Sequence, residues 1–138
     1  MNWTLEVVVV PVSDVDRAKA FYAEQLGFVV DHDTVIGDAL RLVQLTPPGS
    51  GCSVVIGEGL SPMTPGSVQG LQLVVNDVRR AHAELTSRGV DVGPVQFLGS
   101  SGGARPAEED DDLNNAGFVF FADPDGNGWA VQQITARG

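Results

Sequence analysis

The triplet Asp31-His32-Asp33 combines an imidazole with two carboxylates, which are groups that bind divalent cations. It follows the apolar residues Phe28 to Val30, which are typical of a strand. Consecutive side chains of a strand point to opposite faces of the sheet, so His32 and its neighbours are not expected to converge on one ion. We therefore expect a surface strand here and no metal site.

The other reactive side chains lack the partners that catalysis requires. Cys52 is the only cysteine and has no histidine near it in the sequence, which favours a buried, inert thiol. His82 lies between two alanines of a predicted helix. The Gly/Ser segments 49–51 and 99–103 lack the lysine of a phosphate-binding loop. These groups leave the catalytic residues unassigned.

The composition excludes several classes of partner. The net charge of -10 argues against nucleic acid and anionic membranes, which require a basic surface, and is compatible with a cationic ligand. Five of the acids form the run Glu108 to Asp112, which we interpret as a solvated loop. The single cysteine and the absence of an export or membrane signal favour the cytoplasm.

A nine-residue segment occurs twice. Residues 12–20 recur as residues 75–83 with six of nine positions identical, each copy lying between a valine-rich strand and a helix that ends at glycine. The first copy continues with predicted strands at 28–30, 39–45 and 52–56, and the second with strands near 90–97, 118–121 and 129–134. The polar segment 99–115 is predicted to be a loop, and Asp123 to Asn127 a hairpin turn.

These patterns predict one α+β domain over residues 1–138, built from two tandem βαβββ modules at about 1–60 and 66–138. The chain resembles the vicinal oxygen chelate superfamily, the glyoxalase, bleomycin-resistance and extradiol dioxygenase group. The resemblance rests on three sets of motifs that span nearly the whole chain: Val10-Pro11-Val12-Ser13-Asp14 with Ala20-Phe21-Tyr22 and Leu26-Gly27-Phe28, Val75-Asn76-Asp77 with Ser87-Arg88-Gly89-Val90, and Phe121 to Asn127. It implies a U-shaped mixed sheet around a cleft, and a homodimer.

The resemblance also indicates where metal ligands would lie. The superfamily's metal enzymes place ligands at positions that Val7, Gly70 and Ala130 occupy here, and none of these side chains can bind a divalent cation. We therefore expect no metal and no cofactor. Glyoxalase or extradiol dioxygenase chemistry of the usual kind is not expected.

Strand alternation indicates which residues share a face with these positions and line the cleft. It places no Asp, Glu, His or Lys on the cleft face of the assigned strands, and it directs Trp129 away from the cleft. The predicted ligand-binding residues are mostly apolar, with two amides that can orient a ligand: Trp3, Leu5, Val7, Val9, Gln72, Val74, Ala130 and Gln132.

Two functions remain open. The leading hypothesis is a metal-free small-molecule-binding protein that holds an apolar or aromatic ligand, for resistance or sequestration. The alternative is an enzyme of the same fold, a lyase, isomerase or dioxygenase-like protein, with a non-standard site. The acidic run 108–112 would supply such a site by folding over the cleft as a lid. Metal ligands at displaced positions, such as Gln72 and Gln133, are another source.

Overall fold

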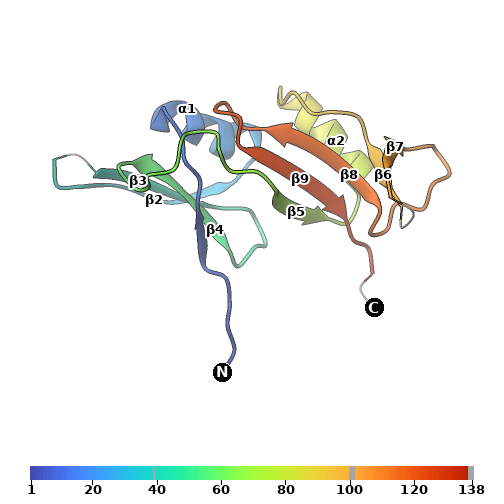
Figure 1. Cartoon of the computed structure of the whole chain (residues 1–138), viewed down its shortest axis with the longest axis horizontal. Helices are drawn as coiled ribbons and strands as arrows, with labels where there is room; N and C mark the ends of the chain where they lie inside the picture. Colours follow the sequence, from blue (N-terminus) through green and yellow to red (C-terminus); the bar gives the residue numbers. More distant parts are fainter. Residues whose placement is uncertain (39, 100–101, 137–138) are drawn as a thin grey trace. The chain divides into compact units, whose positions relative to one another are not determined.

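The computed structural model describes residues 1–38, 40–99 and 102–136. The chain divides into two compact units, Met1–Val68 with Asp123–Asn127, and Gln69–Ala122 with Gly128–Gly138. Each unit contains one sheet and one main helix (Figure 1). The predicted α+β class is therefore confirmed, and unit 1 has the predicted order βαβββ, whereas unit 2 has one strand more. No helix within the described ranges is long and apolar enough to cross a membrane.

Unit 1 holds a four-stranded sheet, which we call sheet 1, in the order β1-β4-β3-β2. β1 is parallel to β4, and the other pairs are antiparallel. Strand β2 extends well beyond the three residues predicted for it, and Ala39, the predicted first residue of the next strand, lies outside the described residues. The elements are β1 (Val7–Val9), α1 (Val15–Ala20), η1 (Phe21–Gln25), β2 (Val29–Ile36), β3 (Leu40–Thr46) and β4 (Ser53–Glu58).

The helix of unit 1 begins at a capping carboxylate and ends in a wider turn. The side chain of Asp14 accepts a hydrogen bond from the backbone N–H of Arg17 at 3.1 Å, which satisfies one free donor of the first turn. The π-helical turn η1 follows, with the N–H of Leu26 donating to the carbonyl of Phe21 at 3.0 Å. One side of sheet 1 forms the core with this helix. The core residues are Val15, Ala18, Phe21, Tyr22, Val43, Leu45, Val54 and Ile56.

Unit 2 holds a five-stranded sheet, which we call sheet 2, in the order β5-β9-β8-β6-β7. β5 is parallel to β9, and the other pairs are antiparallel. Asp77 caps α2 as Asp14 caps α1, accepting from the N–H of Arg80 at 3.1 Å. The elements are β5 (Leu71–Val75), α2 (Val78–Ser87), β6 (Gln96–Leu98), β7 (Ala104–Pro106), β8 (Gly117–Ala122) and β9 (Gly128–Gln133).

We had predicted that the polar segment 99–115 is a loop. This prediction is wrong in part, because the segment contains strand β7. Arg105 pairs with Phe97 across β6 and β7, and its guanidinium lies 4.4 Å from the centre of the Phe97 ring. Arg105 also donates two hydrogen bonds of 2.8 Å to Asp111, which lower the pKa of that carboxyl to about 2. The acidic run is thereby tied to a strand of its own unit. Ser100 and Ser101 of the predicted Gly/Ser turn lie outside the described residues.

The predicted turn Asp123–Asn127 joins β8 to β9 but belongs to unit 1. Its two polar ends are buried, with Asp123 5% and Asn127 0% exposed. Oδ2 of Asp123 accepts from the Tyr22 hydroxyl at 2.6 Å and from Nδ2 of Asn127 at 2.8 Å. Asn127 also donates to the carbonyl of Pro11 and accepts from the N–H of Val68. The turn is thus hydrogen-bonded to the end of β1, the helix and the linker.

We expect Tyr22→Phe to lower the free energy of unfolding by about 1–2 kcal/mol, because the buried carboxyl loses one donor that water cannot replace. Urea denaturation followed by circular dichroism measures the change. Ser13→Ala is the control, since Ser13 bonds to Asp125 of the same turn at an exposed position. Equal losses in the two variants would contradict the role of burial.

Candidate functional site

The two sides of sheet 1 differ in burial. On the helix side the central residues Val43 and Ile56 are 0% exposed, whereas Val7 on the other side is 40% exposed. Residues paired across neighbouring strands share a side, so the registers define what we call the open face of sheet 1. One row across it is Val9, Val55, Gln44 and His32, and a second is Val7, Ser53, Thr46 and Val29.

His32 therefore lies on the face of Val7 and Val9, beyond the segment 28–30 for which the sequence analysis assigned a strand and considered its faces. Its position results from a register shift between Val30 and His32, a β-bulge at Asp31. Val30 pairs with Leu45 on the helix side, and one extra residue turns His32 to the open face. Sequence alternation missed it because a bulge has no signature in this segment.

Asp31 also lies on the open face, since it follows Val30 of the helix side and bonds to Thr46. Its carboxylate accepts a hydrogen bond from the hydroxyl of Thr46, whose oxygen lies 2.6 Å from that of Ser53. A hydroxyl carries one hydrogen, and Thr46 gives its hydrogen to the carboxylate, so Ser53 must donate to Thr46. This directed chain ends beside Val7, the partner of Ser53 in β1. Ser53 is 6% exposed.

Asp33 points to the helix side, opposite to its neighbour His32, because it follows the bulge and pairs with the buried Val43. It accepts from Lys19 at 2.8 Å and from Arg41 at 3.0 Å, and these two cations hold the pKa of its carboxyl well below its usual range. The triplet is therefore split between the two faces. In the described ranges, no group of three or more His, Cys, Asp or Glu side chains is placed to hold a metal ion.

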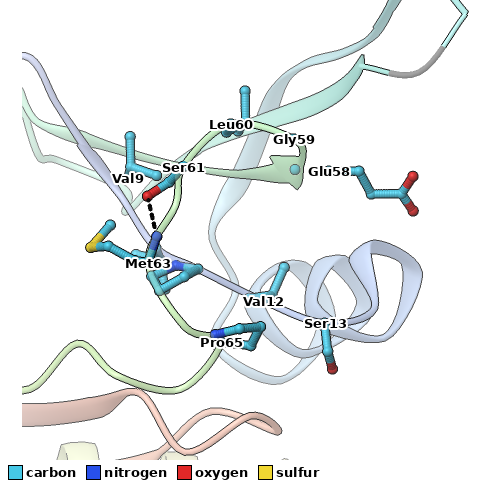
Figure 2. Close-up of a pocket in the computed structure, with 12 residues that line it drawn as sticks. Val9, Val12, Ser13, Glu58, Gly59, Leu60, Ser61, Met63 and Pro65 are labelled. Atoms are coloured by element: carbon cyan, nitrogen blue, oxygen red, sulfur yellow. Dashed lines mark hydrogen bonds between the residues drawn. The ribbon is translucent and has the colours of Figure 1, made fainter.

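A pocket of about 360 Å³ lies where β1 and β4 end. Its lining is mixed: Figure 2 shows the apolar side chains of Val9 and Met63 on one side and Pro65 nearby, Ser13 and Ser61 contribute polar groups, and the side chain of Glu58 points away from Met63. Val9 belongs both to this pocket and to the open face of sheet 1. The pocket and the face are therefore continuous within unit 1.

Gly57 allows the linker to cover this end of the sheet. A Cβ at Gly57 would lie 2.2 Å from the carbonyl oxygen of Arg41 and 2.6 Å from Cδ1 of Leu60. Ser61 then accepts the N–H of Met63 at 3.0 Å, which fixes the next turn of the linker (Figure 2). Glycine is required here by close approach, and the result is an apolar wall from residues remote from β1 in sequence.

The four predicted ligand-binding residues of unit 2 lie together on one face of sheet 2. Gln72 pairs with Ala130, and Val74 with Gln132. Nε2 of Gln72 donates to Oε1 of Gln132 at 2.6 Å, and Nε2 of Gln132 donates to the carbonyl of Asn115 at 2.8 Å. The two amides thus orient each other. Phe118 and Phe120, which we had not predicted, complete this face through β8 and are stacked with ring centres 6.0 Å apart.

Trp129 lies on the opposite face of sheet 2, as predicted. It is 5% exposed and stacks on Phe121 with ring centres 6.2 Å apart. Gly70, at one of the former ligand positions, has a φ of +85°, a backbone conformation that favours glycine. This backbone conformation is a sufficient reason for a glycine at this position.

The predicted residues of unit 1 are solvent-accessible. Trp3 and Leu5 precede β1 and are 87% and 69% exposed, and Val7 and Val9 follow within the strand. The hypothesis that these residues and those of unit 2 line one cleft stays a prediction. The residues that the sequence analysis missed in unit 1 reach the open face through strand register: Asp31, His32, Gln44, Thr46, Ser53 and Val55.

Comparison with known proteins identifies the family to which this chain belongs. Residues 4–131 match the model of the Glyoxalase/Bleomycin resistance protein/Dioxygenase superfamily. No curated protein matches the chain significantly.

Solved structures resemble nearly the whole chain. The antibiotic binding protein TnmS3 from Streptomyces sp. CB03234 is 32% identical with a TM-score of 0.74, covering 96% of this chain and 97% of that one. A glyoxalase/bleomycin resistance protein from the same organism is 34% identical with a TM-score of 0.71, covering 94% and 100%. A superfamily member from Sphaerobacter thermophilus DSM 20745 is 26% identical with a TM-score of 0.74, covering 96% and 98%.

We expect Thr46→Val to lower the free energy of unfolding by about 1–2 kcal/mol, because the buried Ser53 hydroxyl loses its acceptor and Asp31 its donor. Thr34→Val is the matched control: Thr34 lies on the open face of the same sheet and is exposed. Chemical denaturation measures both variants. A loss for Thr46→Val no greater than that for Thr34→Val would contradict the directed hydroxyl chain.

Proposed function

Because the chain belongs to the glyoxalase, bleomycin resistance protein and dioxygenase superfamily, we propose that it is a small-molecule-binding protein that holds its ligand without a metal. The observation that carries the proposal is the continuity, through Val9, between the open face of sheet 1 and the pocket of about 360 Å³. Apolar walls with a few oriented polar groups are the usual composition of a small-molecule site.

The ligand we infer is apolar or aromatic. Valine side chains and the exposed Trp3 supply apolar area, and each buried CH₂ group of a ligand contributes about 0.8 kcal/mol. The similarity to a protein named as antibiotic-binding supports a role in resistance or sequestration.

We expect measurable binding of the neutral probe 1-naphthylmethanol by isothermal titration calorimetry, and at least a tenfold loss in Val7→Glu, because a carboxylate on the open face would be desolvated by the neutral ligand. Val35→Glu is the matched control: Val35 is 66% exposed and pairs with Arg41, on the helix side of the same sheet. Equal losses in the two variants would contradict the proposed site.

Metal independence is tested on the same protein, purified without a histidine tag. Affinity should be unchanged after EDTA treatment, and mass spectrometry should find no stoichiometric metal after incubation with nickel, zinc, iron or manganese salts. A bound metal at one equivalent that raises ligand affinity would overturn the metal-free proposal.

A second candidate is an enzyme of the same fold with a non-standard site. The observation that favours it is His32, which lies on the same face as Val9 and is of the residue type most often used for proton transfer. Incubation with a bound ligand, followed by mass spectrometry of that ligand, distinguishes the two functions. Conversion that is lost in His32→Ala would establish the enzyme.

We further propose a homodimer. Large apolar side chains are exposed on both units, among them Trp3, Leu5, Val74 and Phe120, and a second copy would remove them from water. Sedimentation velocity should give a mass of about two chains at micromolar concentration. A monomer throughout that range would contradict the dimer.

A further inference from the structure

We propose that Asp31 is the recognition point on the open face of sheet 1 for a positively charged group of the ligand. This inference rests on the proposed binding function and names the chemical class of the ligand more closely: an apolar or aromatic molecule that carries an ammonium or another cation. Three observations support it, namely the position of the carboxylate, its hydrogen bonding and the charge balance of unit 1.

The carboxylate lies beside the apolar part of the face. Asp31 bonds to Thr46, which belongs to the row that continues through Ser53 to Val7. A ligand lying on Val7 and Val9 would therefore have Asp31 at the β2 end of this row. This arrangement, an apolar surface with one charge at its side, fits a molecule with an apolar body and one cationic substituent.

The hydrogen bond from Thr46 orients the carboxylate and leaves it able to accept more. A carboxylate has two oxygens with about four acceptor sites, and in the described part of the chain Thr46 is the side-chain partner of Asp31. Ser53 cannot compete for Asp31, because it donates to Thr46. The remaining acceptor sites are therefore available to donors from a ligand.

The charge balance of unit 1 leaves Asp31 uncompensated. Residues 1–68 contain three basic side chains, Arg17, Lys19 and Arg41. Arg17 pairs with Asp125 at 3.2 Å, Lys19 with Asp33 at 2.8 Å, and Arg41 with Asp16 at 2.8 Å and Asp33 at 3.0 Å. Asp16, Asp33 and Asp125 thus receive these cations, and Asp31 on the open face receives none of them.

The test uses three naphthalene probes of one shape and different charge: 1-naphthylmethylammonium, 1-naphthylmethanol and 1-naphthoate. Calorimetry at pH 7 and low salt should give affinities that fall in the order cation, alcohol, anion. We expect the cation to bind about fivefold more tightly than the alcohol. This preference should shrink at 0.5 M NaCl because salt screens an accessible charge.

Asp31→Asn should abolish the preference for the cation and leave the affinity for the alcohol within twofold of the wild type. Glu24→Gln is the matched control, since it removes the same charge from an exposed position in η1 of the same unit, and it should retain the preference. A preference that survives Asp31→Asn, or is absent in the wild type while the alcohol still binds, would overturn the inference alone.

Two further outcomes are distinct. If none of the three probes binds the wild type, the binding proposal and the inference fail together. If Asp31→Asn no longer binds the alcohol either, the variant has lost the whole site and does not test the charge. The salt dependence of the wild type then tests the role of Asp31: a preference for the cation that is the same at low and high salt would overturn it.

Discussion

The fold of unit 1 depends most on the hydrogen bonds that the buried carboxyl group of Asp123 accepts. Burying a carboxyl is costly unless its oxygens are hydrogen-bonded. Here Oδ1 accepts the backbone N–H groups of Asp125 and Asn127, both at 2.9 Å, and Oδ2 accepts from Tyr22 and from the Asn127 side chain. Four donors from two sequence regions more than 100 residues apart meet on one side chain. The fold can satisfy this carboxyl only with helix and turn together.

That arrangement also prepares the pocket. Asn127 donates to the carbonyl of Pro11 and accepts from Val68, so it fixes the chain just after β1 and the end of the linker that follows β4. Pro11 itself lines the pocket. Gly66 lies close to the same turn, since a Cβ there would be 2.1 Å from the carbonyl oxygen of Asp125. The pocket thus lies between segments whose positions are set by the buried turn.

The sequence predicted the elements that local chemistry determines. Asp14 and Asp77 begin helices because their side chains satisfy free N–H groups, and Pro124 and Gly126 favour a turn. Parity along β5 and β9 correctly placed these four residues on one face: Gln72, Val74, Ala130 and Gln132. The same parity failed in β2, because the bulge at Asp31 depends on pairing with β3. The burial of Asp123 and Asn127 was likewise beyond a local pattern, since their partners are distant in sequence.

The two modules preserve the residues that build the fold and differ in those that face a ligand. Both retain the capping aspartate and the parallel pairing of first and last strand, which backbone geometry requires. On their open faces, however, one module has valines with the Asp31, Thr46 and Ser53 chain, and the other has paired glutamines with stacked phenylalanines. Residues on an exposed face can change without disturbing the hydrogen bonds of the strands. Duplication therefore explains the architecture, and the chemistry of each face must be argued from its own side chains.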